Sequence, residues 1–501
     1  MATDLVVRMR NVIGKPAPVS IMYTVNRRNF PFFSEWRQVA PGDWAIRYPK
    51  EEPFGLAALW EIPGFGKVIV TADNEGKWYR ADQGGLVDWR AEAAKSKVKR
   101  VQDRMQSLAQ SGYQFAPTLV AQIAQAAAEL QAALKMEGEA AARRLDGVLK
   151  AAFWAGEEVE LTKARADLAR LSLEERRAKL FGSTFFRPDA PETFQERFAA
   201  LYNFATIPFY RRRLEPVQGQ PDWATRDLLL DWLDERGIAR KGHPLCWYIE
   251  HGLTDWMKKL SYKTLKEVVY QQIYDTVSRY KNRIKIWDVI NEAHDPIVKG
   301  NDLNLNAEQV YEVTALACKA TRDADPEAIR IVNINRPWGE YRSEWEMMDP
   351  MHAIEYLEEL AARGVEYEIN GVQMYHGGPE HYCRDMAEQS ALIDSYVALG
   401  KPVHISEIQT PSSMEADPTR WLGGQVAPSG WWHRPWDPEV QADWVEQFYT
   451  IASSKVNAVT WWNLSDRETF WPHGGLLDIN DQPKPGYHRL KAFIENLRAD
   501  K

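Results

Sequence analysis

Two glutamates each stand at the end of an apolar segment that is typical of a buried strand. Glu292 closes IKIWDVINE, and Glu407 closes PVHISE. An acid that protonates a leaving oxygen, with a second carboxylate as nucleophile or base, is the pair that hydrolysis of a glycosidic bond requires. Retention of configuration needs the two carboxyl groups about 5–5.5 Å apart. The alternative is that each glutamate is only a salt-bridge partner, which explains one such residue more readily than two.

Both glutamates belong to an alternation of short apolar segments and amphipathic segments that begins near residue 178. Helical stretches such as DLLLDWLDERG and AEQVYEVTALACKATRDA separate the apolar segments. Eight such strands predict a (β/α)8 barrel rather than an open sheet, with its active site at the C-terminal ends of the strands. The strand segments are KLFGSTFF, NFATIPFY, GHPLCWYI, IKIWDVIN, IRIVNIN, INGVQMYH, PVHISEI and VNAVTWWNL.

Two further parts precede the barrel. Residues 1–90 contain short β-branched and aromatic runs separated by turn residues, which is typical of a small β-sandwich. Residues 91–177 carry apolar residues at helical spacing and predict two or three long helices, which either pack on a neighbouring domain or form an oligomer contact. The predicted fold is α/β: a TIM barrel over 178–501 with an N-terminal β-sandwich-like domain and a helical insert.

The composition of the 501 residues narrows the class of substrate. Lys and Arg number 62 against 70 Asp and Glu, a net charge of −8, which argues against a surface for nucleic acid. The 21 Trp residues favour carbohydrate, because planar side chains stack on sugar rings, although tryptophan-rich cores are the alternative. The same two explanations apply to Trp36, Trp44, Trp60 and Trp78 of the N-terminal part, which we expect to be carbohydrate-binding-like or a packing module.

Other function classes lack a motif. The three cysteines form no metal-like pattern, and His381, Cys383 and Asp385 lack the spacing of a zinc site. No glycine-rich phosphate loop follows a strand, so no cofactor is implied. No segment reaches about 18 uncharged apolar residues, and MATDLVVRMRN lacks the basic stretch and apolar run of a signal peptide. We therefore expect no metal, nucleic acid or membrane partner.

The segments around the two glutamates resemble glycoside hydrolase family 10, whose best-known members are endo-β-1,4-xylanases. WDVINEAHD, ISEI, KGHPLCW and VTWWNLSD…GGLLDINDQPKPGYHRL stand in the order and spacing of that family's barrel. The resemblance covers roughly 178–501. It implies that Glu292 is the acid/base, that Glu407 is the nucleophile, and that Asn291 hydrogen-bonds the sugar 2-hydroxyl, a contact that strengthens in the transition state.

The resemblance also implies residues that bind the sugar. His243 and Trp247 match the family's histidine and tryptophan at the −1 sugar. Trp462 and Trp471 match the aromatic platform after strand eight.

A further match is His376, which follows GVQMY. It resembles the family's histidine that hydrogen-bonds the nucleophile, but its spacing is one residue short, so Gln373 or Tyr375 could occupy the neighbouring role. A histidine there would hold the carboxylate ionised and oriented. A strand-end histidine bound to backbone is the alternative.

The second strand departs from the family. Xylanases of the family carry Glu-Asn-x-x-Lys there, whose Asn and Lys bind the −2 sugar, whereas YNFATIPFYRRRLEP is shorter and lacks it. The polar residues near the end of this strand are instead Tyr210, Arg211 and Arg212, so we expect the −2 site to be rebuilt or closed, with Tyr210 and Arg212 as candidate substrate-binding residues. An arginine suits a carboxylate or sulfate on the sugar, while pairing of this arginine run with a local acid such as Glu215 is the alternative.

Three other stretches differ or stand out. Tyr248-Ile249-Glu250-His251 replaces the usual His-Ser-Gln, and Ile408-Gln409 replaces Leu-Asp, which removes a possible support for His376. WLGGQVAPSGWWHRPWD has the composition of an aromatic loop over the cleft, or of one packed on the rim. Its tryptophans are Trp421, Trp431, Trp432 and Trp436.

The leading interpretation is a retaining glycoside hydrolase that cleaves β-1,4-linked polysaccharide by double displacement, with xylan as the leading candidate substrate. A family 10-like enzyme on a different, for example anionic, glycan is one alternative, and a non-catalytic carbohydrate-binding protein is another. The resemblance implies a polysaccharide or oligosaccharide partner and a secreted or periplasmic location. Self-association through the helical segment stays open.

Overall fold

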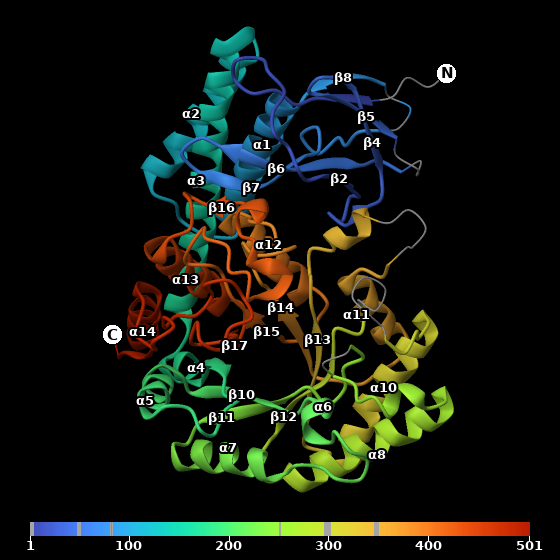
Figure 1. Cartoon of the computed structure of the whole chain (residues 1–501). Helices are drawn as coiled ribbons and strands as arrows, with labels where there is room; N and C mark the ends of the chain where they lie inside the picture. Colours follow the sequence, from blue (N-terminus) through green and yellow to red (C-terminus); the bar gives the residue numbers. More distant parts are fainter. Residues whose placement is uncertain are drawn as a thin grey trace.

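The computed structural model describes residues 5–47, 52–80, 82, 84–249, 252–294, 302–344 and 350–500; the side chains of residues 421 and 422 lie outside that description. Figure 1 shows a β-rich part with long helices beside it at one end of the molecule and a ring of strands surrounded by helices at the other.

Eight parallel strands close into a barrel, in which the last strand pairs again with the first. The predicted (β/α)8 barrel is therefore confirmed. One strand ends earlier than GHPLCWYI predicts, at His243, because Pro244 has no N–H with which to continue the ladder. The strands are β9 (Leu180–Thr184), β10 (Phe204–Pro208), β11 (Ala239–His243), β12 (Ile286–Asn291), β13 (Ile329–Ile334), β14 (Ile369–Gln373), β15 (Val403–Ile408) and β17 (Ala458–Trp461).

Helices cover the outside of the barrel (Figure 1). They are α5 (Glu192–Leu201), α7 (Ala224–Glu235), α8 (Tyr262–Tyr280), α10 (Ala307–Ala324), α11 (Ala353–Ala362), α12 (Met386–Val397), α13 (Pro438–Ser453) and α14 (Pro485–Arg498). The short α6 (Arg211–Leu214) follows the C-terminal end of β10. Short 3-10 turns lie in the loops: η1 (Met257–Lys259), η2 (Glu340–Ser343), η3 (Trp421–Gly424) and η4 (Ala427–Ser429).

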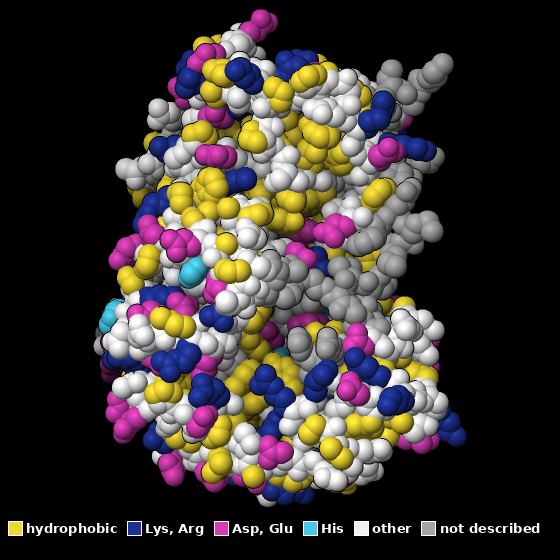
Figure 2. Space-filling model, in the orientation of Figure 1, with side chains coloured by type: hydrophobic (Ala, Val, Ile, Leu, Met, Phe, Trp, Pro, Cys, Tyr) yellow, Lys and Arg dark blue, Asp and Glu magenta, His cyan; other side chains and the backbone are white. Residues whose placement is uncertain are grey.

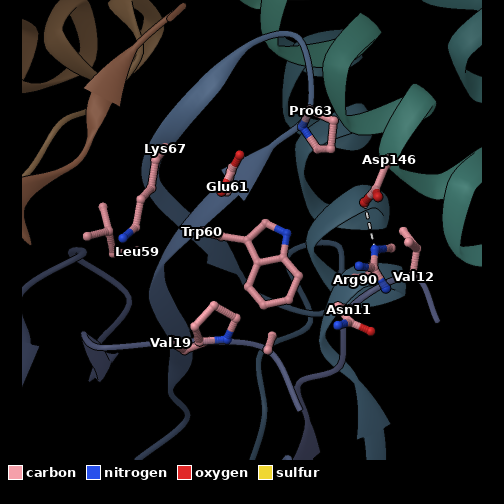
Figure 3. Close-up of a pocket in the computed structure, with 12 residues that line it drawn as sticks. Asn11, Val12, Val19, Leu59, Trp60, Glu61, Pro63, Lys67, Arg90 and Asp146 are labelled. Atoms are coloured by element: carbon pink, nitrogen blue, oxygen red, sulfur yellow. Dashed lines mark hydrogen bonds and ion pairs between the residues drawn. The ribbon is translucent and has the colours of Figure 1, made fainter. Parts of the chain in front are cut away.

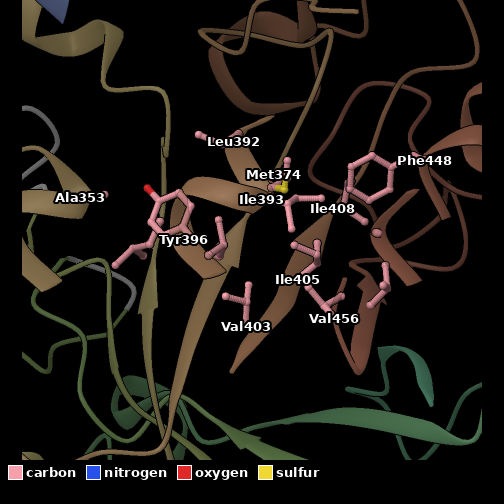
Figure 4. Close-up of a cluster of buried hydrophobic side chains, with 14 of the residues drawn as sticks. Ala353, Met374, Leu392, Ile393, Tyr396, Val403, Ile405, Ile408, Phe448 and Val456 are labelled. Atoms are coloured by element: carbon pink, nitrogen blue, oxygen red, sulfur yellow. The ribbon is translucent and has the colours of Figure 1, made fainter. Parts of the chain in front are cut away.

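The barrel core lies between the strands and these helices. In β15, Val403 and Ile405 belong to a buried cluster with Ile393 and Tyr396 of α12 and Phe448 of α13 (Figure 4). Because successive strand residues point to opposite faces, the apolar outer face leaves the inner face of the same strands to polar side chains.

The N-terminal strands form two sheets, in the orders β4-β5-β1-β8 and β16-β7-β6-β2-β3. Leu5 and Val7 of the first and Leu56, Ala58 and Val70 of the second share one buried cluster, as expected of packed sheets. The strands are β1 (Leu5–Arg8), β2 (Met22–Val25), β3 (Pro31–Phe32), β4 (Glu35–Ala40), β5 (Asp43–Arg47), β6 (Gly55–Ile62), β7 (Gly66–Ala72) and β8 (Gly85–Asp88).

The helices that follow are α1 (Trp89–Gln110), α2 (Pro117–Ala133), α3 (Gly138–Arg170) and α4 (Leu173–Ala178). The first three pack on one another, and α3 also lies against α12 and α13 of the barrel. Glu157 of α3, 2% exposed, accepts hydrogen bonds from Trp432 Nε1 at 2.7 Å and from the Met386 backbone N–H at 2.9 Å. The helical segment therefore contacts both the N-terminal sheets and the barrel.

Strand β16 (Trp431–Trp432) comes from the barrel part of the chain but pairs with β7 of the N-terminal sheet. At Gly66 a Cβ would lie 2.7 Å from the Trp431 carbonyl oxygen, so this approach needs glycine. Trp432 and Trp436 are buried. The expected aromatic loop over the cleft is therefore a seam between two parts of the molecule, except that the side chain of Trp421 lies outside the described residues.

Candidate active site

Irregularities in two strands aim the site residues inward. In β12 the pairing with β13 shifts between Asp288 and Ile290. Asp288 and Asn291 are three positions apart and would point to opposite faces of a regular strand. The shift lets both side chains make contacts inside the barrel. In β15 the pairing shifts against both neighbouring strands after Ile405, which brings Ser406 and Glu407 to the same side. Bulges of this kind re-aim side chains next to active sites.

Glu407 is 4% exposed, and each of its carboxylate oxygens accepts a hydrogen bond from a neutral donor. Tyr375 Oη donates to Oε2 at 2.8 Å, and Asn333 Nδ2 donates to Oε1 at 3.0 Å. Ser406 Oγ donates to Asn333 Oδ1, which fixes that amide. His243 Nε2 lies 3.8 Å from Glu407 Oε1. The orientation of the carboxylate is therefore set from several strands.

Glu292 is half-buried and follows β12 in the left-handed region, with φ 57°, a conformation that costs energy for a residue with a side chain and that recurs at active sites. Trp247 Nε1 donates to its Oε2 at 3.0 Å, and Gln373 Nε2 donates to its Oε1 at 2.8 Å. Gln373 and Asn333 also donate to Asn291 Oδ1, at 3.2 and 2.8 Å. One amide network therefore links both glutamates.

A buried charge cluster lies beside the amide network. Asp288 Oδ2 is 2.6 Å from His243 Nδ1 and 2.7 Å from Lys241 Nζ. Burial alone would raise the pKa of Asp288, but Lys241 and His243 together hold it below its usual value. Burial lowers the pKa of His243, which favours a neutral imidazole at neutral pH.

The two glutamates interact electrostatically. Burial, and then the negative charge of Glu292, raise the pKa of Glu407 to about 8, while Lys241 and the Tyr375 hydrogen bond act in the opposite direction. Protonation of one member of such a pair removes the repulsion, so the two carboxyl groups titrate as a coupled pair.

Aromatic rings enclose one side of the pair. The Tyr210 ring centroid lies 5.5 Å from that of His243 and 5.7 Å from that of Trp247. Trp462 lies 5.0 Å from His243. Phe186 joins the group at 5.9 Å from Tyr210 and 5.8 Å from Trp462. The structure thus brings the predicted residues His243, Trp247, Trp462 and Tyr210 together.

The predicted role of Trp471 needs correction. Its side chain is fully buried and stacks on Tyr375, with ring centroids 4.9 Å apart and an interplanar angle of 26°. The ring therefore supports Tyr375 and offers no open surface to a sugar.

The predicted contact between His376 and the nucleophile is wrong. His376 Nδ1 lies 2.9 Å from Gln389 Nε2 of α12, and its ring stacks on Trp444 of α13 at 5.2 Å. The reason is strand alternation: Gln373 and Tyr375 face inward, so that His376 faces the helices. Tyr375 makes the contact that the resemblance implied for the histidine.

The arginines after β10 divide between two environments. Arg211 is buried and pairs with Glu215, its Nη1 lying 3.1 Å from Oε2. Arg212 is exposed on α6, and so is Arg213, whose guanidinium lies 6.0 Å from the Tyr210 ring centroid. The alternative of local pairing thus applies to Arg211. Glu250 and His251, which belong to the stretch Tyr248-Ile249-Glu250-His251 after β11, lie outside the described residues.

Several site residues were missed in the sequence. Asn333, Asp288 and Lys241 each lie within or beside an apolar strand segment, which is the signal that identified the two glutamates. Phe186 gave no signal, because an aromatic residue after a strand is common in any core.

A hollow of about 230 Å³ lies in the N-terminal part beside β6, α1 and α3 (Figure 3). Trp60 stands in the middle of its lining, and Arg90 Nε donates to Asp146 Oδ1 at 2.6 Å on one side. Trp60 is 5% exposed, and Arg90 lies 5.5 Å from its ring centroid. The indole is therefore covered, and it offers no open face for stacking on a sugar.

Within the described part of the chain, no group of His, Cys, Asp and Glu side chains is placed to hold a metal ion. The cysteines Cys246, Cys318 and Cys383 are free and buried. No described helix combines the length and apolar character needed to cross a bilayer.

Comparison with known proteins gives consistent relatives. An endo-1,4-beta-xylanase 3 of Hypocrea jecorina is 24% identical over 287 residues, 56% of this chain and 72% of that protein. An endo-1,4-beta-xylanase B of Neocallimastix patriciarum is 27% identical over 268 residues, 52% of this chain and 28% of that protein.

Among solved structures, xylanase XynB of Paenibacillus barcinonensis is 22% identical, with a TM-score of 0.49 over 65% of this chain and 96% of that one. The model of "Glycosyl hydrolase family 10" matches residues 210–493, more than half of the chain. This chain therefore belongs to glycosyl hydrolase family 10 and is a glycoside hydrolase.

Proposed function

We propose that this enzyme cleaves β-1,4-linked polysaccharide through a glycosyl–Glu407 intermediate, and that xylan is its substrate. The observation that carries the proposal is the pair of glutamates on opposite sides of the barrel mouth, joined through the amides of Gln373, Asn291 and Asn333. The substrate is inferred from relatives that are endo-1,4-beta-xylanases.

The environments of the two carboxyls support different roles. Glu407 is the more buried and receives two neutral donors, which hold it in one orientation for attack on the anomeric carbon. Glu292 is more accessible, as a group that meets the leaving oxygen and then a water must be. When Glu292 carries the proton, the like charge that raises the pKa of Glu407 is absent, and Glu407 can ionise.

The reaction then follows in two steps. Glu407 attacks the anomeric carbon while Glu292 protonates the departing oxygen; Glu292 next removes a proton from water, which attacks the ester and restores the original configuration. Asn291 accepts through Oδ1 from two amides, which leaves its NH2 group to donate to the sugar 2-hydroxyl. His243, Trp247, Trp462 and Tyr210 would surround the sugar ring.

The roles can be tested by the stereochemistry of azide products from an aryl β-xylobioside. Glu407→Ala cannot form the intermediate, so azide that occupies the vacated space yields an α-glycosyl azide. Glu292→Ala still forms the intermediate when the leaving group is good, and azide then yields the β-glycosyl azide. Proton NMR of the anomeric product distinguishes them. Reversed products reverse the assignment, and wild-type rates on xylan in both variants exclude this pair.

An anionic substituent on the polysaccharide is the second candidate feature. It is favoured by the exposed Arg212 and Arg213 of α6, next to Tyr210. Figure 2 shows Lys and Arg side chains over the part of this face that carries α6 and α8. Comparison of kcat/KM on neutral arabinoxylan and on glucuronoxylan, in wild type and Arg212→Ala, tests it: a preference for the acidic polymer that the variant loses supports the role.

We also propose that the chain divides into an accessory module over 1–90, a helical segment over 91–177 and the barrel over 178–501. Affinity electrophoresis of the Glu407→Ala chain and of residues 1–90 on xylan tests carbohydrate binding outside the barrel.

Self-association through α2, on which Val120 is 42% exposed, is tested by light scattering. A polymeric substrate also favours action outside the cytoplasm, which fractionation of the native host would test.

A further inference from the structure

The hydroxyl of Tyr375 takes the place that the family resemblance gives to a histidine. Its Oη donates to Glu407 Oε2 at 2.8 Å. Burial, followed by the charge of Glu407, raises the pKa of Tyr375 well above its usual value, so the hydroxyl keeps its proton. The donor on the carboxylate is thus one that does not change charge while the glutamates titrate.

The ring of Tyr375 is held from behind by the loop that follows β17. Trp471 of this loop stacks on it at 4.9 Å. The Trp471 backbone N–H donates to Thr469 Oγ1 at 2.9 Å, and Thr469 Oγ1 donates to Gln409 Oε1 at 3.1 Å. These contacts lead from Glu407 through Tyr375, Trp471 and Thr469 to Gln409. Since Gln409 lies two positions after Glu407, they form a closed circuit.

Gln409 is suited to this place because it is neutral and can donate. It is 0% exposed, and its Nε2 donates to the carbonyl oxygens of Asn463 and Gly474 at 3.1 and 3.3 Å. A carboxylate there would keep the Thr469 hydroxyl as a donor, but it would face the two carbonyl oxygens with no proton to offer. The acid that the resemblance implies at this position is therefore disfavoured by this loop, and the amide of Gln409 fits it.

We propose that Tyr375 is the positioning residue of Glu407, and that Gln409 and Thr469 act on the reaction by holding Trp471 against Tyr375. This rests on the proposed function, in which Glu407 is the nucleophile. The circuit replaces a titratable imidazole and a carboxylate by groups that stay neutral. It orients the nucleophile by hydrogen bonding and packing alone, and one donor of Glu407 remains in place at every pH at which the enzyme works.

The test compares Tyr375→Phe, Thr469→Val and the double variant on 4-nitrophenyl β-xylobioside. Tyr375→Phe is expected to lower kcat about ten- to a hundredfold, the range for a hydrogen bond to a charged group, with KM changed less than about threefold. The acid limb of kcat/KM should move to higher pH, because the lost donor favours the carboxylate. Thr469→Val, which keeps the shape of the side chain, should shift kcat and the acid limb in the same direction by less.

Coupling is the decisive readout. The double variant should be no slower than Tyr375→Phe alone, because Thr469 acts through Tyr375. Tyr396→Phe is the matched control, since its buried hydroxyl donates to the Pro337 carbonyl oxygen at 3.2 Å, and it should leave the pH profile unchanged.

Wild-type kcat and pH profile in Tyr375→Phe, or effects of the two substitutions that multiply, overturn the inference. If azide shows instead that Glu407 is not the nucleophile, the proposed function itself fails, so the two failures are distinguishable.

Discussion

Lys241 and Asp288 form an ion pair inside the barrel, with Nζ 2.7 Å from Oδ2 and side chains 1% and 0% exposed. The same carboxylate oxygen lies 2.6 Å from His243 Nδ1, so the pair fixes the imidazole that faces Glu407. A buried charge of this kind depends on its partner, because desolvation is not recovered otherwise.

Lys241→Met should lower the free energy of unfolding by about 3–5 kcal/mol, since it leaves Asp288 buried without its cation. Urea unfolding measures the loss. The Lys241→Met/Asp288→Asn double variant is the control and should recover part of it. A single variant as stable as wild type would mean that water or His243 already neutralises Asp288.

Stability should fall with rising pH because of Glu407. Its pKa is raised from 4.5 to about 8 in the folded chain, so the folded state binds more protons than the unfolded state between these values. Stability is then fully present below the lower value and is lost as pH rises through about 8. Glu407→Gln removes this dependence, and its stability relative to wild type should increase from pH 5 to pH 9 in denaturant unfolding. Glu439→Gln, at an exposed site on α13, should follow the wild type, and parallel curves for all three proteins contradict the prediction.

The barrel and its two glutamates were predictable because they depend on periodic patterns that many residues share. The bulge near Ser406 that aims Glu407 inward was not, since it changes which face each residue occupies without changing composition. The exchange of Tyr375 for His376 has the same origin, because one position decides whether a side chain faces the site or the helices. The pairing of β16 with β7 joins residues far apart in the chain, which local patterns do not reveal.

His376→Phe should leave kcat within about twofold of wild type, although Tyr375→Phe slows the enzyme. The phenylalanine keeps the stacking on Trp444, and only the contact to Gln389 is lost, which costs about 1 kcal/mol of stability. Steady-state kinetics and thermal unfolding check both parts. A large loss of kcat with an unchanged melting temperature would return His376 to the active site.

A chain that begins at residue 176 should be less stable than the intact chain or should aggregate. It keeps the barrel, which begins at β9, but it loses α3, whose contacts cover α12 and α13. It also loses β7, the partner of β16. Light scattering and thermal unfolding of the two chains decide the matter. A soluble 176–501 chain with the melting temperature of the intact protein would show that the helical segment does not stabilise the barrel.

Glu157 offers a finer test of the same contact, because it lies on α3 while its partners belong to the barrel part. Its carboxylate accepts from Trp432 Nε1 and the Met386 N–H, and its Oε2 lies 2.7 Å from His433 Nε2. Glu157→Ala leaves buried donors without an acceptor and should lower the free energy of unfolding by on the order of 3 kcal/mol. Glu157→Gln keeps one carbonyl oxygen for Trp432 and Met386 and should lose less. Hydrogen exchange at the Met386 amide separates the cases: faster exchange in Glu157→Ala than in Glu157→Gln follows from an acceptor at the seam, whereas equal exchange would show that α3 docks by apolar packing alone.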